Sequence, residues 1–390
     1  SPTDMLKGFF FFFITDTKKR NDANEKWRKQ MEELLKQGST ETADFCKAWL
    51  RSQYANTIRE KRKDSKPGDF DRLGSEFHRW VRENKEFLGL KSPDSFFRFI
   101  SRNFEFYAKE YRHVRKASSN LTVSLEDFFY IAQTGFTLQY PAILAPLTCD
   151  DDTDIALIKE KMVSAYLDIF LARRIWNSRS ISYSALKHPI HEITCKVRNK
   201  KPDELAKILK SLLNEEKLDF TERLAFHSRN RPHIHWLLAR ITDYVQTQSG
   251  EASHYLEYAG IKGKKYEIEH IWADHPEDHT DEFKDPTDFH SYRNLLGGLL
   301  LLPKKFNASY GDMPYETKME QYNSQNILAR SLHKACYEYN PGFNQFIRDS
   351  ALPFSPCSTF KKTDIEKRQK LYQLIAELIW SPSRIDTLLV

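Results

Sequence analysis

Hydrophobic residues recur at helical spacing along most of the first 250 residues of the chain. Trp27, Met31, Leu34 and Leu35 form one apolar stripe, and Gly38 is a natural stop for the helix that this stripe predicts. The same spacing predicts further helices, which we place at residues 40–63, 70–87, 93–111, 155–176 and 202–213 and, near the C-terminus, from Thr363 onward. The pattern therefore predicts a mainly α protein.

The pattern changes between residues 264 and 330. Residues 266–271, Tyr-Glu-Ile-Glu-His-Ile, and the apolar run at 299–302 are each of strand length, and a helix-like run follows at 314–329. This order predicts a small strand–strand–helix insertion in a helical protein. We therefore expect a helical domain at residues 1–250, a distinct module at 251–350 and a C-terminal packing helix within 351–390.

The strand–strand–helix segment also carries the candidate chemistry. Glu269 and His270 are adjacent on the first expected strand, Asn294 lies in a loop, and Asn307 stands where the second strand gives way to a helix. A neutral histidine can take a proton from water near pH 7. A hard divalent cation held by a carboxylate and an amide oxygen can neutralise charge on a phosphate. Neighbouring strand residues point to opposite faces, so one can address the water and the other a metal.

These residues stand in a pattern that resembles the HNH, or ββα-metal, domain at the C-terminus of GmrSD-type modification-dependent restriction proteins. That group includes phosphorothioate-sensing effectors. The family pattern is an acid–His–Ile strand, an Arg-Asn loop before a Leu-rich strand, and an Asn-x-Ser element followed by a helix with a Lys and a Tyr. The chain supplies these residues as Glu269-His270-Ile271, Arg293-Asn294, Leu299–Leu302, Asn307, Ser309, Lys318 and Tyr322.

The resemblance implies a metal-dependent DNA endonuclease that nicks one strand. His270 would be the general base, supported by Asn294, and Glu269 and Asn307 would hold Mg²⁺ or Mn²⁺. Two departures from the family affect the loops: Ala273-Asp274 stands where many members have a proline, and Gly298 stands where the family often has asparagine.

The resemblance also implies a role in defence against phage, with double-stranded phage DNA as the substrate. The chain begins at Ser1 without a methionine, and residues 1–7 resemble the junction that follows an NTPase-like module in the same family. We therefore expect an N-terminal NTPase-like domain of the same protein to precede this chain. The sequence itself contains no glycine-rich phosphate-binding loop of the Walker type.

Charge is distributed unevenly between the expected parts. Residues 251–350 carry 11 Lys and Arg against 16 Asp and Glu, whereas residues 1–250 carry 43 against 34. The acidic module suits a cation site, and the helical part offers positive charge for a DNA backbone. Close to the module, we expect phosphate contacts from Lys318, Arg293, Arg229, Arg231 and Lys304.

Other residue clusters have simpler interpretations. We interpret Asp150–Asp154 as the acidic first turn of a helix. We interpret His233 and His235 as packing or capping residues of a separate helix, whose start Pro232 indicates. The five cysteines have no paired spacing, which favours a cytoplasmic protein with reduced thiols. The longest apolar run is too short for a membrane helix, so we expect no membrane partner.

Three alternatives stay open at this stage. The same finger could cleave RNA, or the protein could be a non-catalytic helical scaffold that binds nucleic acid. Within the acid-rich segment 274–288, His275 or His279 could help to hold the metal.

Overall fold

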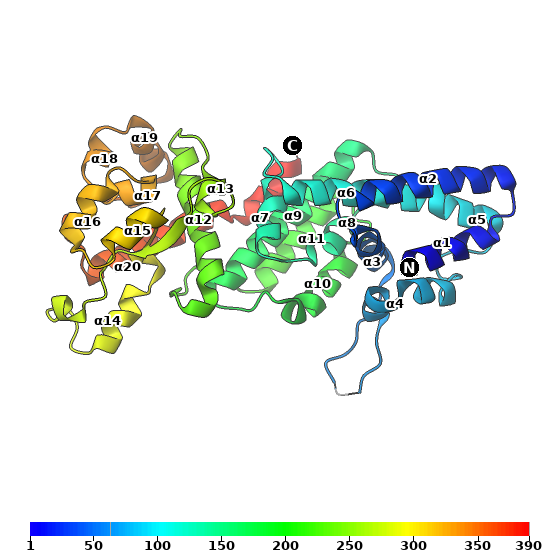
Figure 1. Ribbon diagram of the computed structural model, residues 1–390, viewed down its shortest axis with the longest axis horizontal. Helices are drawn as coiled ribbons and strands as arrows, with labels where there is room; N and C mark the ends of the chain where they lie inside the picture. The colour runs from blue at the N-terminus through cyan, green and yellow to red at the C-terminus, as the bar shows by residue number, and fades with distance from the viewer. Residues whose placement is uncertain (63, 390) are drawn as a thin grey trace. The chain divides into compact units, whose positions relative to one another are not determined.

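The chain forms two compact units, which are described separately. The computed structural model describes residues 1–62 and 64–389, so the last residue of the expected C-terminal segment lies outside the described part. The first unit comprises residues 1–171, 180–217 and the segment that begins at Pro382. The second comprises residues 172–179 and 218–381. Both are mainly helical, which confirms the predicted fold class at this level (Figure 1).

The first unit is built from helices alone among its described residues. They are α1 (Pro2–Phe13), α2 (Thr17–Leu35), α3 (Glu41–Tyr54), α4 (Asp69–Glu83), α5 (Pro93–Arg98), the π-helix η1 (Phe99–Phe104), α6 (Glu105–Ser119), α7 (Glu126–Gln133), α8 (Gln139–Leu144), most of α9 (Thr153–Trp176), α10 (Tyr183–Val197), α11 (Pro202–Glu215) and the 3-10 helix η5 (Pro382–Leu389).

Aromatic residues fill the core of this unit. The Trp27 ring of α2 stacks on Phe104 with centroids 4.3 Å apart, and Phe45 and Trp49 of α3 pack beside them. All four side chains are buried. Large rings contribute much apolar area and prefer defined mutual geometries, so this cluster fixes how α2 and α3 pack on the η1 segment.

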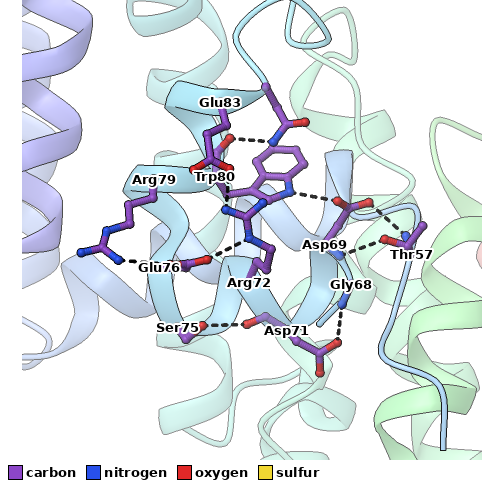
Figure 2. Close-up of polar contacts among 11 residues, drawn as sticks. Thr57, Gly68, Asp69, Asp71, Arg72, Ser75, Glu76, Arg79, Trp80 and Glu83 are labelled. Carbon is purple, nitrogen blue, oxygen red and sulfur yellow. Dashed lines mark hydrogen bonds and ion pairs between the residues drawn. The ribbon is translucent and has the colours of Figure 1, made fainter. Parts of the chain in front are cut away.

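The predicted helix at 40–63 ends earlier than the periodicity indicated, at Tyr54. The reason lies in α4, because the Asp69 carboxylate accepts hydrogen bonds from the backbone N–H groups of Asn56 and Thr57 and so holds that strand-like segment out of the helix. Asp69 also accepts from the Trp80 indole N–H at 2.9 Å (Figure 2). Nearby on α4, Arg72 bridges the carboxylates of Glu76 and Glu83 (Figure 2).

The second unit combines short helices with one pair of strands. Its elements are η2 (Ser228–Asn230), α12 (Arg231–Gln248), α13 (Tyr255–Tyr258), β1 (Tyr266–His270), η3 (Pro276–His279), α14 (Pro286–Arg293), η4 (Leu296–Gly298), β2 (Leu299–Pro303), α15 (Lys304–Tyr310), α16 (Tyr315–Tyr322), α17 (Ile327–Arg330), α18 (Ala335–Glu338), α19 (Pro341–Ser350) and α20 (Lys362–Ile379).

Strands β1 and β2 pair in antiparallel register, with Glu269 opposite Leu300 and His270 opposite Leu299. All five residues of β2 are buried, so this strand is a core strand and its Leu-rich sequence follows from burial on both faces. Helix α15 follows directly and packs against both strands. The expected order of strand, strand and helix is therefore present.

Two details of this region differ from the sequence prediction. The expected helix at 314–329 is divided into α16 and α17, because the Asn326 side chain caps α17 by accepting from Ala329 and also donates to the Leu301 carbonyl of β2. The acid-rich segment 274–288, for which the sequence favours a solvated loop, contains η3 and the start of α14, whose N-terminus Asp285 caps by accepting from Thr287.

The C-terminal helix α20 packs closely against the loop between α14 and β2. The Gly297 amide donates to Gln369 Oε1 at 2.9 Å, and Arg368 donates to the Gly297 carbonyl. A Cβ atom at residue 297 would lie 2.3 Å from the Ile365 carbonyl oxygen. Only glycine permits this approach, so Gly297 sets the position of the loop on α20.

All five cysteines are free, as their spacing predicted. None of the helices in the described part of the chain combines the length and the apolar character needed to cross a bilayer.

Candidate active site

His270 stands at the end of β1 and is oriented by Asn294. The His270 Nε2 atom lies 2.9 Å from Asn294 Oδ1, and the Phe226 ring meets the imidazole edge-on with centroids 5.4 Å apart. An amide oxygen only accepts hydrogen bonds, so Nε2 carries the hydrogen and Nδ1 keeps its lone pair. This arrangement leaves Nδ1 as the atom that can take a proton.

The surroundings of His270 keep it neutral. Burial lowers the pKa of His270 to about 4, and the nearby Arg293 charge acts in the same direction. At neutral pH the imidazole is therefore uncharged and able to act as a base. The hydrogen bond from Nε2 gives Asn294 the role of orienting His270.

Glu269 points to the other side of β1 and is engaged in a buried ion pair. Lys318 of α16 donates to Glu269 Oε1 at 2.7 Å and to the His270 carbonyl at 3.1 Å, and the Tyr322 hydroxyl lies 3.5 Å from the same carboxylate oxygen. The Lys318 and Glu269 side chains are 0% and 3% exposed. The structure thus gives Lys318 a role different from the predicted phosphate contact, because its ammonium group does not reach the surface.

Glu269, one of the two predicted metal ligands, does not fit a cation in this arrangement. The Glu269 carboxylate is buried and neutralised by Lys318, so an ion at that oxygen would have to displace the ammonium group. Asn307 lies in α15, where its amide Nδ2 donates to the Ile268 carbonyl at 3.2 Å. Among the described residues of this module, no three His, Cys, Asp or Glu side chains lie close enough together to hold a metal ion.

The remaining predicted phosphate contacts differ in exposure. Arg293 is half-buried, and its Nε donates to the Trp272 carbonyl at 3.2 Å. Lys304 is exposed and lies 3.5 Å from Glu267. Arg229 in η2 and Arg231 at the start of α12 are both exposed. Their segment is held beside the Asn294 loop, because the Phe226 amide donates to the Asn294 carbonyl at 2.7 Å.

The simpler interpretations of the other clusters agree with their contacts. Asp152 accepts from the Ile155 amide at the start of α9, and Asp151 pairs with Lys159 at 2.8 Å, as expected for a helix N-terminus. His235 packs against β1, with Nε2 3.0 Å from the Tyr266 carbonyl. His279 lies against the Trp272 ring with centroids 4.3 Å apart.

Two residues near His270 were absent from the sequence prediction. Phe226 packs on the imidazole ring, and Asp274 is close enough for its charge to raise the His270 pKa slightly against the effect of burial. Nothing in the sequence marks Phe226, which is 44 positions from His270. Asp274 was noted only as a departure from the family pattern, although its place four residues after the histidine brings it to the same loop.

Comparison with known proteins gives one family match. Residues 213–373 match the family model described as the C-terminal domain of GmrSD restriction endonucleases. No curated protein and no solved structure matches the chain significantly. The matched span contains β1, β2 and every residue placed around His270 above. It supports a restriction-type nuclease with DNA as its substrate. The match confirms, for residues 213–373, the resemblance to the C-terminal nuclease region of GmrSD-type restriction proteins that the sequence predicted.

Proposed function

We propose that the module at residues 251–350 is a metal-dependent HNH endonuclease that nicks DNA, with His270 as its general base. The observation that carries the proposal is the His270–Asn294 pair, in which Nε2 lies 2.9 Å from Oδ1 and Nδ1 keeps its lone pair. A base at the end of a rigid strand, oriented by a side chain from a neighbouring loop, is what proton abstraction from water requires.

In the proposed reaction, water attacks the phosphorus while its proton passes to His270 Nδ1. The new phosphorus–oxygen bond forms as the bond to the 3′ oxygen breaks, and the leaving oxygen takes a proton from solvent. Asn294 holds the imidazole through Nε2 and stabilises the imidazolium that forms, because its amide oxygen accepts from the N–H on the opposite side of the ring. We assign no catalytic step to Asn307, whose amide supports β1 through the Ile268 carbonyl.

Metal dependence enters the proposal through the family resemblance. Mg²⁺ or Mn²⁺ would neutralise charge on the phosphate, but the Glu269 carboxylate that was expected to bind it is held by Lys318. The requirement for a cation is therefore tested separately from the requirement for His270.

DNA binding is assigned to the accessible basic residues and to the helical part of the chain. Arg229 and Arg231 are exposed on the segment that packs beside the Asn294 loop, and Lys304 is exposed at the start of α15. The helical domain at 1–250 would bind the sugar-phosphate backbone of DNA without recognising the base sequence. By the family resemblance, we further propose a cytoplasmic phage-defence role, with target choice by an NTPase-like domain of the same protein.

A supercoiled-plasmid assay tests this function. The chain is compared with His270→Ala and with His254→Ala, a matched control at an exposed histidine of the same module. Each is incubated with Mg²⁺, with Mn²⁺ and with a chelator. We expect conversion to open circles by the parent and by His254→Ala in the presence of metal, and loss of it in His270→Ala by about 10²–10⁴-fold.

Two outcomes would support the alternatives. Cleavage of single-stranded RNA in preference to the plasmid, with the same dependence on His270, would make the module an RNA nuclease. An inactive parent that retains plasmid binding would favour the non-catalytic scaffold. A third outcome, equal nicking by the parent and by His270→Ala, would exclude His270 as the base.

A further inference from the structure

A second cluster of ionisable side chains lies in the first unit, within the helical part of the chain. Glu110 and His113 are three residues apart on α6 and therefore share one face of that helix. Glu160 meets them from α9, and one possible ligand atom from each residue lies within 4.8 Å of the others. Both glutamates are buried, at 8% and 0% exposure of their side chains, whereas His113 is 36% exposed.

The protein's own hydrogen bonds leave this cluster incomplete. His113 Nδ1 lies 2.7 Å from Glu160 Oε2, but Glu160 Oε1 is buried and has no hydrogen-bond partner. A buried carboxylate oxygen without a partner is costly, and here a second buried carboxylate stands beside it. Among the described residues, Lys109 is the lysine that pairs with this group, with Nζ 3.3 Å from Glu110 Oε1, and its side chain is 58% exposed.

The charges of the cluster point in the same direction. Two carboxylates, Glu110 and Glu160, lie side by side and are buried, whereas the Lys109 side chain is mostly exposed. The cluster therefore attracts positive charge, and the partner that would satisfy it must also reach the unpaired Glu160 Oε1.

We propose that Glu110, His113 and Glu160 form a site for a divalent transition-metal ion, of the class of Zn²⁺, Fe²⁺ or Mn²⁺, that joins α6 to α9. A Glu-x-x-His pair on one helix facing a glutamate on another is a donor set that helical bundles use for such ions. The imidazole selects for transition metals over Mg²⁺ and Ca²⁺. This inference is independent of the proposed nuclease function, whose residues lie in the other unit.

The spacing of the ligand atoms is close to that of a bound site. Ligands at about 2.1 Å from one ion lie at most about 4.2 Å apart, against the 4.8 Å limit within which these atoms are found. Small rotations of the glutamate side chains bring them into range. Three protein ligands leave coordination positions for water, which can enter beside the partly exposed His113.

A Co²⁺ titration of the full chain tests the site, because cobalt reports its ligands through its visible absorption and shows thiolate binding by a separate charge-transfer band. The titration is made on the chelator-treated His270→Ala protein, so that the nuclease module contributes no histidine base. Two site variants, Glu160→Gln and His113→Asn, are compared in this background with Glu105→Gln. Glu105 is a carboxylate on the same helix that lies 3.3 Å from Lys26, outside the cluster.

We expect one equivalent of Co²⁺ to bind with oxygen and nitrogen ligands and to raise the melting temperature. Both site variants should bind it at least about 10-fold more weakly, and Glu105→Gln should bind it like the parent. Equal binding by Glu160→Gln and the parent would overturn the proposal. A parent that binds no Co²⁺ would overturn it as well, and a higher melting temperature of chelator-treated Glu160→Gln would then show that a shared proton completes the cluster. The melting curve of Glu160→Gln without metal also shows whether that variant folds.

Discussion

The Lys318 ammonium lies 2.7 Å from Glu269 Oε1, and both side chains are almost completely buried. One residue belongs to α16 and the other to β1, so the pair joins the helix to the strand that ends at His270. Because adjacent strand residues point to opposite faces, holding Glu269 inward turns His270 outward, toward Asn294. Lys318 also donates to the His270 carbonyl at 3.1 Å, so the ion pair positions the proposed base through its backbone, while the hydrogen bond to the imidazole comes from Asn294.

This relationship predicts a strong coupling between the two side chains. Glu269→Gln or Lys318→Met alone should destabilise the fold by about 3–5 kcal/mol, because each leaves one buried charge without its partner. The double variant should cost clearly less than the sum of the two. Urea unfolding followed by circular dichroism measures the cycle, and strictly additive effects would mean that the pair is not coupled.

Asn294 should affect the rate of nicking more than it affects the fold. Asn294→Ala removes the acceptor at His270 Nε2, and we expect a decrease of about 10-fold or more, bounded by the 10²–10⁴-fold contribution of a general base. Asn294→Asp keeps an acceptor and adds a negative charge, which should raise the pKa of His270. The acidic limb of its pH–rate profile should therefore shift to higher pH than in the parent, because His270 becomes protonated at a higher pH. An unchanged profile would argue against contact between the two residues during catalysis.

The low pKa of His270 also predicts a pH dependence of stability. Burial lowers this pKa from 6.5 to about 4, so the unfolded chain takes up the proton first as the pH falls. The stabilisation that this residue contributes is complete above pH 6.5 and is lost between pH 6.5 and 4. His270→Asn cannot be protonated in this range, so its unfolding free energy should fall less steeply with pH. Urea midpoints of both proteins in chelator, measured across that interval, test the difference.

Gly297 should tolerate no side chain. Gly297→Ala would place its Cβ 2.3 Å from the Ile365 carbonyl oxygen and 2.4 Å from the Gln369 amide nitrogen, both of which are backbone atoms of α20. We expect a loss of about 1–3 kcal/mol or more, because neither the loop nor the helix can yield by rotating a side chain. Gly311→Ala is the matched control, since a Cβ there meets nothing within 4 Å. Similar urea midpoints for the two variants would contradict this account of the loop.

The sequence predicted those features that depend on local spacing. The strands, the His270–Asn294 pairing and the common face of Lys318 and Tyr322 follow from periodicity and from the family pattern, and both of these α16 residues do reach one carboxylate. What Lys318 contacts was not predictable, because its partner is 49 positions away and burial depends on how α16 packs on β1. Glu269 was assigned to a metal for the same reason, because the sequence pattern does not show that a buried lysine faces its carboxylate.

A final prediction about DNA binding concerns the two exposed arginines in η2 and at the start of α12. Arg229 and Arg231 are exposed in the described structure, on the segment that the Phe226 amide anchors to the Asn294 loop. If each neutralises one phosphate, Arg229→Gln with Arg231→Gln should weaken binding to plasmid of any sequence. The slope of log affinity against log salt should also fall by about 2 in magnitude. Arg348→Gln, which removes an exposed arginine from α19, is the matched control and should leave that slope unchanged. Nicking by the double variant should recover when the salt concentration is lowered, because the loss lies in binding and the base is intact. A slope equal to that of the parent would place the phosphate contacts elsewhere on the chain.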